Sequence, residues 1–260
     1  MKSIIDSHCH VMREYFGDEQ KEVIERAFAE GVVQMVNPAC SLTDIGEVLT
    51  LAERYPGIYA AVGIHPHEAK HWQSDSESIL LRAAENSKVV AIGECGLDFF
   101  YNHSEAAQQK EVFAIHVKMA VALKMPIIVH CRDAWDECLD ILEEHGQGQV
   151  RGVFHCFTGG PEILPRIKKL DFYVSFSGIL TFKKSAAIQE AAPLVAENRI
   201  LVETDCPYLA PQKVRGKRNE PSFVWHTLDK LAELRATSAE STAKSCVDNA
   251  RELFALPVLN

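Results

Sequence analysis

The stretches IIDSHCH, residues 4–10, and ILVETDCP, residues 200–207, decide the fold of this chain. Each is a short apolar run, typical of a buried β-strand, and each run gives way to side chains that bind metal ions. His8 and His10 follow the first run, and Asp205 follows the last. The two runs lie at opposite ends of a series of parallel strands, and only a closed barrel brings the first and last strands together. An open doubly wound sheet is the alternative, but no glycine-rich phosphate loop follows the first strand.

Three more apolar runs end in the same way. Glu94 follows VVAI in VVAIGECG, His130 follows PIIV in PIIVHCR, and His155 follows GVF in GVFHCF. A single histidine in such a position is more often a core or loop residue than a ligand. Because five runs share the same phase, we expect these side chains to gather at the carboxyl ends of the strands and to bind metal.

Apolar runs alternate with amphipathic segments along the whole chain. Strands are predicted at residues 3–6, 32–36, 58–62, 89–92, 127–129, 152–154, 173–176 and 200–203. Helices are predicted at residues 20–30, 42–55, 76–86, 106–123, 134–144, 161–169, 184–192, from 221 onward, and 239–254. This alternation predicts an α/β fold, a single (β/α)8 TIM barrel of the metallohydrolase type. No linker or break in composition is visible, so one domain over residues 1–260 is expected.

Composition is that of an ordinary soluble protein, with 47% apolar and 24% charged residues. No apolar stretch reaches the roughly 18 residues that a membrane span requires, and no signal peptide is recognisable, so a cytoplasmic location without membrane contact is expected. The net charge of −9 argues against a non-specific coat of nucleic acid, although bound metals reverse the charge locally. Neither an obligate protein partner nor an oligomeric state follows from the sequence.

Eight cysteines are present without a CxxC motif, and five of them directly follow a proposed ligand. Side chains alternate along a strand, so a cysteine beside an inward ligand points outward and packs as a small apolar group. We therefore expect packing cysteines in a reducing compartment. The rejected alternative makes them thiolate ligands, which usually form tight CxxC clusters.

Each predicted ligand also has a plain structural interpretation. The HxH pair His8 and His10 is suited to one metal, but two polar residues in a turn would look the same. A buried carboxylate at Glu94 needs a strong partner, either a pair of metals that it bridges or a lysine or arginine. Glu203 lies two residues before Asp205 and is expected to support it, or to play a structural role.

A second group of residues is expected to face the substrate. His65 and His67 follow the third strand, and Arg132 and Asp133 follow His130. Four cations lie within six residues after the last strand: Lys213, Arg215, Lys217 and Arg218. Loops after the last strands of a barrel often bind phosphate, and guanidinium groups suit it. A solvated charged loop is the alternative.

At these residues the sequence resembles the TatD family of metal-dependent deoxyribonucleases. The matching segments are DSHCH at 6–10, GIHPH at 63–67, GECGLDFF at 93–100, VHCRDA at 129–134, FHCFTG at 154–159, FSGILTF at 176–182, ETDCPYLAP at 203–211 and RGKRNEP at 215–221. The resemblance implies a divalent-metal phosphodiesterase acting on DNA, including 3′-to-5′ exonuclease activity. It implies metal binding at the six positions His8, His10, Glu94, His130, His155 and Asp205. It places His65 and the loop 215–219 near bound substrate or phosphate.

The expected mechanism uses two divalent ions (Mg²⁺, Mn²⁺ or Zn²⁺) roughly 3.5–4 Å apart. Glu94 bridges them, and an activated water attacks phosphorus while Asp205 positions it and takes its proton. Four imidazoles favour Zn²⁺, Mn²⁺ or Fe²⁺, whereas the family is usually described as Mg²⁺-dependent, so the metal stays open.

Single strands or ends are the expected DNA substrate, with Phe99, Phe100 or Tyr208 available either to stack unpaired bases or to pack against the protein. The first alternative is a hydrolase of another ester or amide, such as a D-aminoacyl-tRNA deacylase or an amidohydrolase; such relatives commonly carry a carboxylated lysine where this chain has Glu94. The second alternative is a non-catalytic, metal-stabilised scaffold, which would usually close its site with four ligands.

Overall fold

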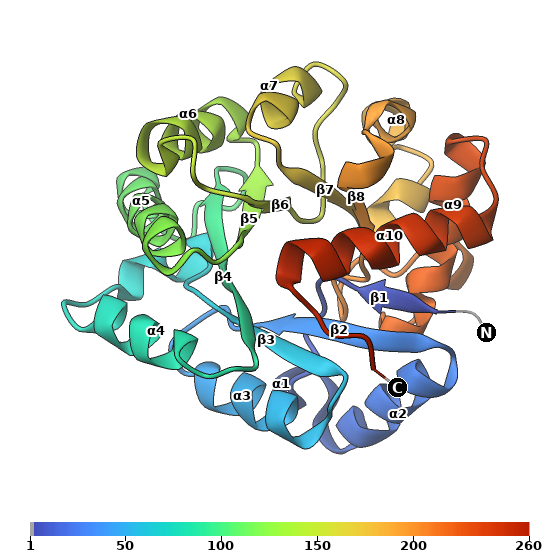
Figure 1. Ribbon diagram of the computed structural model, residues 1–260, viewed down its shortest axis with the longest axis horizontal. Coiled ribbons are helices and arrows are strands. Elements are labelled where there is room, and N and C mark those ends of the chain that lie inside the picture. Colours follow the sequence, from blue (N-terminus) through green and yellow to red (C-terminus); the bar gives the residue numbers. More distant parts are fainter. Residues whose placement is uncertain (1–2, 260) are drawn as a thin grey trace. The chain divides into compact units, whose positions relative to one another are not determined.

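The eight predicted strands are present and follow one another in the sheet in chain order, β1-β2-β3-β4-β5-β6-β7-β8, in a computed structural model that describes residues 3–259. Helices alternate with them (Figure 1). The predicted (β/α)8 TIM barrel is therefore confirmed. Contacts divide the chain into two compact units, which we describe separately; the single domain over residues 1–260 stays a prediction.

The first unit comprises Met1–Asn37, His155–Leu164 and Tyr173–Asn260. Its strands are β1 (Ile4–Asp6), β2 (Val32–Pro38), β7 (Tyr173–Phe176) and β8 (Ile200–Val202). Its helices are α1 (Arg13–Phe16), α2 (Gln20–Ala29), α8 (Ala186–Ala191), α9 (Val224–Leu234) and α10 (Ala239–Phe254). Parallel pairing joins β1 to β2 and β7 to β8, and the Ser7 N–H donates to the Val202 carbonyl, which ties β8 to β1. The four strands of this unit therefore run in the order β7-β8-β1-β2.

Helix α10 shows how sequence sets an element of this unit. It begins after Ser238, whose hydroxyl accepts the Ser241 N–H at 3.1 Å, and it ends at Ala255, which adopts a left-handed conformation. Its buried face, which includes Val247, Ala250 and Leu253, packs on β1 and β8 (Figure 1). This packing fixes the pair of strands from which the first cluster of polar side chains emerges.

The second unit comprises Pro38–Phe154 and Pro165–Phe172. Its strands are β3 (Ile58–Val62), β4 (Val89–Asp98), β5 (Ile127–Arg132) and β6 (Gly152–Phe154), paired in parallel in that order. Its helices are α3 (Ile45–Arg54), α4 (Ser76–Ala84), α5 (Ala106–Leu123) and α6 (Trp135–Gly146). Helix α7 (Leu164–Lys169) begins in the first unit and continues in the second. Helices α5 and α6 lie side by side (Figure 1).

The remaining helical elements are single turns of 3-10 helix. They are Gly17–Glu19, Pro66–His71, Gly178–Thr181, Ala192–Leu194, Glu197–Arg199, Gln212–Val214 and Pro221–Phe223. The helix predicted from residue 221 therefore starts as a 3-10 turn and becomes α9. Among the described residues, no helix is long and apolar enough to cross a membrane.

Strand β4 differs most from the prediction, which ended it at residue 92. It continues to Asp98, so Glu94 lies inside the strand. Two glycines make this possible. A Cβ atom would lie 2.6 Å from the Ile128 carbonyl oxygen at Gly93 and 2.0 Å from the His130 carbonyl oxygen at Gly96, and both residues have positive φ. Only glycine permits so close an approach of β4 to β5, which brings Glu94 beside His130.

Candidate metal centres

The first cluster of polar side chains forms where β1 and β8 end. Beyond the strands, the backbones of the two segments stay hydrogen-bonded: the Asp205 N–H donates to the His8 carbonyl at 2.9 Å, and the His10 N–H donates to the Cys206 carbonyl at 2.9 Å. Asp205 has a left-handed φ of 55°, a conformation that aspartate tolerates better than most residues. These bonds hold His8, His10 and Asp205 on adjoining segments.

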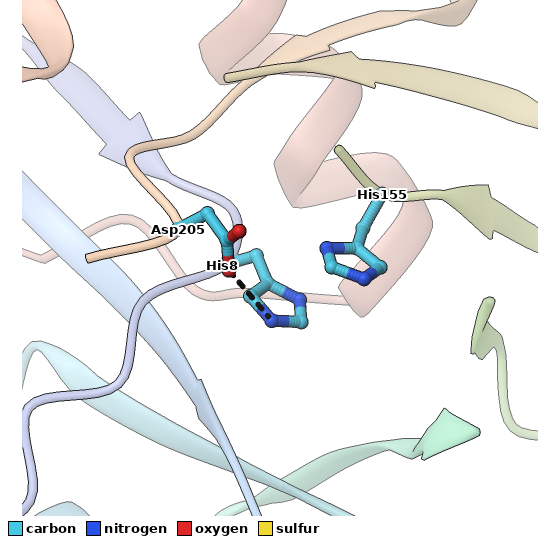
Figure 2. A group of neighbouring side chains, drawn as sticks. All are labelled: His8, His155 and Asp205. Atoms are coloured by element: carbon cyan, nitrogen blue, oxygen red, sulfur yellow. Dashed lines mark ion pairs between the residues drawn. The ribbon is translucent and has the colours of Figure 1, made fainter. Parts of the chain in front are cut away.

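The donor atoms of this first cluster converge. The Nε2 atoms of His8 and His10 are 3.2 Å apart, and each lies 3.7 Å from Oδ1 of Asp205. His155 stacks its ring on that of His8, with the centroids 3.9 Å apart and the planes at 10°. Ligand atoms of His8, His155 and Asp205 all lie within 4.8 Å of one another, and all three residues are buried (Figure 2). The structure thus brings together four of the six predicted ligands.

Glu203 supports His155 in this cluster. Its carboxylate oxygen Oε1 lies 3.3 Å from Nδ1 of His155 and accepts the Cys156 N–H at 2.7 Å. Burial acts to raise the pKa of Glu203, but the hydrogen bond and charge of His155 outweigh it, and the pKa is lowered. An ionised Glu203 fixes which nitrogen of His155 carries the proton, a role typical of carboxylates behind metal-binding histidines. The strand predicted to include Glu203 ends one residue earlier, at Val202.

The second cluster lies in the other unit, between β3, β4 and β5. Oε1 of Glu94 is 3.1 Å from Nδ1 of His130 and 3.4 Å from Nε2 of His65. Ligand atoms of these three residues lie within 4.8 Å of one another. Burial lowers the pKa of His65 to about 4, although the charge of Glu94 raises it. His65, predicted to lie near the substrate, is therefore placed with the two remaining predicted ligands.

Asp98 belongs to the second cluster and was not predicted. Its Oδ2 lies 3.0 Å from Nε2 of His130 and 3.1 Å from Nε2 of His67. Burial acts to raise the pKa of Asp98, but hydrogen bonds from His130 and His67 outweigh it and hold the pKa well below its usual range. His130 therefore has a carboxylate on each side: Asp98 at Nε2 and Glu94 at Nδ1. The signal in the sequence is weak, because Asp98 is one acidic residue in the quoted segment GECGLDFF.

Both clusters fit divalent metal ions by the chemistry of their donor atoms. Two imidazole nitrogens and a carboxylate oxygen converge in the first, and two imidazoles share one carboxylate oxygen in the second. Buried imidazoles and carboxylates are ligands of Zn²⁺ and related ions. The cysteines are free thiols; of the five beside predicted ligands, four are buried and Cys156 is half-buried, which agrees with packing.

The predicted phosphate-binding cations lie in different surroundings. The Arg132 guanidinium stacks over Phe100 at 4.0 Å and Tyr101 at 4.7 Å, measured to the ring centroids. The Arg218 guanidinium forms an ion pair with Glu19 and donates to the Tyr15 carbonyl at 3.2 Å. These partners occupy Arg218 more fully than Arg132.

The remaining predicted substrate residues are more exposed. Arg215 stacks over Phe182 at 4.5 Å, and Lys217 lies on the surface. Tyr208 is 52% exposed, and its ring centroid lies 6.4 Å from that of His10. Tyr208 therefore stands beside the first cluster with a free face.

Comparison with known proteins gives three consistent similarities. Residues 5–255 match the family model described as TatD related DNase. The chain is 39% identical over 251 residues to a Bacillus subtilis (strain 168) protein named uncharacterized metal-dependent hydrolase YabD, with 96% of this chain and 98% of the relative covered. It is 36% identical over 248 residues to a protein of Erwinia billingiae (strain Eb661) named 3′-5′ ssDNA/RNA exonuclease TatD, with 93% and 95% covered. The crystal structure of YjjV, a TatD homologue from Escherichia coli K12, superimposes with a TM-score of 0.92 at 29% identity and covers 98% of each chain.

Proposed function

The chain belongs to the family of TatD-related DNases, and from that premise we propose that it removes nucleotides from the 3′ end of single-stranded DNA. Membership makes it a metal-dependent hydrolase, and the name of the Erwinia billingiae relative supports the proposed substrate and direction. The observation that carries the proposal is the buried convergence of His8, His155 and Asp205, whose ligand atoms lie within 4.8 Å of one another.

We assign one divalent ion to the first cluster and a second to the other. His8, His10, His155 and Asp205 would hold the first, and Glu94, His130 and His65 would hold the second. When bound, such ions acidify water and neutralise charge on phosphate oxygens. The predicted bridging of two ions by Glu94 stays a prediction.

Asp205 is the proposed general base. Its side chain is 13% exposed, so it reaches solvent, while its Oδ1 stays within 3.7 Å of both His8 and His10. The backbone bonds to His8 and from Tyr208 fix its position. A water held between these groups would be oriented for attack and would give its proton to Asp205.

Arg132, Arg215 and Lys217 are proposed to contact phosphate groups of the strand, with Arg218 contributing through its loop. The ion pair with Glu19 makes Arg218 the weakest candidate of the four, because phosphate would have to replace an existing carboxylate partner. Hydrolysis of an aminoacyl ester or of an amide is the alternative function, since an activated water attacks carbon as readily as phosphorus. A non-catalytic scaffold is disfavoured by the exposed edge of Asp205.

The test is hydrolysis of a single-stranded DNA oligonucleotide by metal-stripped protein to which Mg²⁺, Mn²⁺ or Zn²⁺ is restored. Labelling the 5′ end in one sample and the 3′ end in another gives the direction, and an RNA strand of the same sequence tests the sugar. Asp205→Asn is the matched variant, expected to bind metal while losing at least about 100-fold in kcat, the usual contribution of a general base.

Stepwise shortening of the 5′-labelled strand, dependent on metal and absent in the variant, is the expected result. Full activity of Asp205→Asn would remove Asp205 from the chemistry. No cleavage of either strand by protein that binds metal, together with hydrolysis of an aminoacyl ester, would replace the proposal with the alternative.

A further inference from the structure

Two large aromatic side chains lie exposed beside the second cluster. Phe100 is 54% exposed and Tyr101 is 51% exposed, and their rings meet edge to face with the centroids 4.8 Å apart. The Arg132 guanidinium lies against both rings. Adjacent exposed aromatics with a cation across them are typical of binding surfaces, because folding alone gives no reason to leave such area in water. We refer to Phe100, Tyr101 and Arg132 as the aromatic platform.

The loop that carries the platform is firmly held. Oδ1 of Asp98 accepts the N–H groups of Phe100 at 3.0 Å and Tyr101 at 2.9 Å. The fully buried Gln109 donates to the carbonyls of Asp98 and Ser104, at 3.1 and 2.8 Å, and so ties both ends of the loop to α5. A surface ordered in advance loses little conformational entropy when a ligand binds.

Asp98 also connects the platform to the second cluster. While Oδ1 holds the loop, Oδ2 lies 3.0 Å from Nε2 of His130, whose Nδ1 faces Glu94. Tyr101 further contacts the ring of His67, with the centroids 5.7 Å apart. A ligand that uses both features needs a flat unsaturated ring next to an anionic group, which describes a nucleotide whose base is unpaired.

We propose that Phe100, Tyr101 and Arg132 form a stacking site for an unpaired nucleobase, adjacent to the phosphodiester group presented to His130. This inference rests on the proposed function and specifies the substrate of that site. Every base offers a π-face to Phe100 or Tyr101, so the site selects single strands without selecting sequence. Arg132 adds a cation that attracts both the base and the neighbouring phosphate. A base inside a duplex cannot present its face, so paired ends must fray before they bind.

Equilibrium binding tests the site without requiring turnover. The metal-loaded protein is titrated into a fluorescein-labelled thymidylate hexamer with phosphorothioate linkages, and into an abasic hexamer with the same backbone. Phe100→Leu/Tyr101→Leu removes both rings, and Phe100→Tyr/Tyr101→Phe keeps two rings at the same places. Leu194→Ala, at a residue 63% exposed on the 3-10 turn Ala192–Leu194, is the control for loss of a surface apolar side chain.

We expect the unaltered protein to bind the thymidylate strand more tightly than the abasic one. The double leucine variant should lose about 5- to 100-fold in affinity for thymidylate, the usual range for one stacked base, and bind the abasic strand as before. The aromatic exchange and Leu194→Ala should retain the preference. Should the double variant unfold, as judged by circular dichroism and metal content, the two single variants replace it.

Equal affinity of the unaltered protein for both strands would overturn the inference, as would a double variant that loses both strands equally. Cleavage of an unmodified labelled strand is followed in parallel and separates this inference from the proposed function. Base-dependent binding without cleavage would leave the stacking site and remove the nuclease. Cleavage without base-dependent binding would leave the nuclease and remove the stacking site.

Discussion

Asp98→Asn is expected to weaken metal binding at the second cluster although Asp98 is not itself a predicted ligand. In the variant, the amide oxygen must stay where Oδ1 is, because it has to accept the N–H groups of Phe100 and Tyr101. The amide NH2 group then faces Nε2 of His130 at the position of Oδ2, 3.0 Å away. Asp98 accepts a proton at this point, whereas the amide donates one.

The consequence is a change in the protonation of the His130 ring. With Asp98 as acceptor, Nε2 carries the proton and the lone pair of Nδ1 points toward Glu94, 3.1 Å away. With an amide donor, Nε2 must accept, so the proton moves to Nδ1 and blocks the lone pair that would bind the ion. Loss of such a supporting partner typically costs about 10- to 100-fold in metal affinity, or roughly 1.4 to 2.8 kcal/mol.

Isothermal titration of metal-stripped protein with Zn²⁺ or Mn²⁺ measures this effect. The matched control is His67→Asn, which removes the other histidine beside Oδ2 but leaves the carboxylate that accepts from His130. The control should keep its affinity within about 3-fold, a difference of less than about 0.7 kcal/mol. Unchanged affinity in Asp98→Asn, or equal losses in the two variants, would refute the argument from the His130 proton.

Glu203→Gln is expected to act in the same way on the first cluster, lowering metal affinity about 10- to 100-fold through His155, while Cys156 keeps an acceptor for its N–H; metal content after dialysis measures it, and full occupancy in the variant would contradict it. His116 predicts a pH dependence of stability: its ring donates to the Val112 carbonyl and accepts the Ile64 N–H, and burial lowers its pKa to about 4. Because the unfolded chain takes up this proton near pH 6.5 and the folded chain only near pH 4, the stabilisation is complete above pH 6.5 and is lost as the pH falls toward 4, by up to about 3 kcal/mol. Urea unfolding of metal-stripped protein at pH 7 and pH 4.5 should show a smaller difference in His116→Gln, and an equal difference would assign the effect to other groups.

Much of the barrel was predictable because buried parallel strands are written as continuous apolar runs. Strands β3, β6 and β7 and helices α5 and α10 begin and end at the predicted residues. Strand β4 was predicted too short because Gly93 and Gly96 interrupt its apolar run. Its extension depends on the close approach to β5, a tertiary contact that no local pattern reports.

The site was predictable to the extent that its side chains follow recognisable runs. His8, His10, His155 and Asp205 come together as the shared phase of those runs predicted. Asp98 was missed because its role depends on two histidines that lie far from it in the sequence.

Partners distant in sequence also limited the prediction of other polar residues. Arg218 was grouped with the phosphate-binding cations, but Glu19, which is 199 residues away, forms an ion pair with it. His116 carries no signal at all, since a lone histidine on a helix resembles any core residue until the Ile64 N–H is placed against it.

The two clusters differ in the ions that their donor atoms favour. The first combines three imidazoles, from His8, His10 and His155, with one carboxylate, and a set rich in nitrogen favours Zn²⁺, Mn²⁺ or Fe²⁺ over Mg²⁺. In the second cluster, both nitrogens of His130 face carboxylate oxygens, so its effective charge depends on where one proton lies. Metal affinity at the second cluster must therefore depend on Asp98 and on pH, whereas at the first it depends mainly on its imidazoles. A single metal requirement for the whole protein would consequently describe the sum of two sites with different preferences.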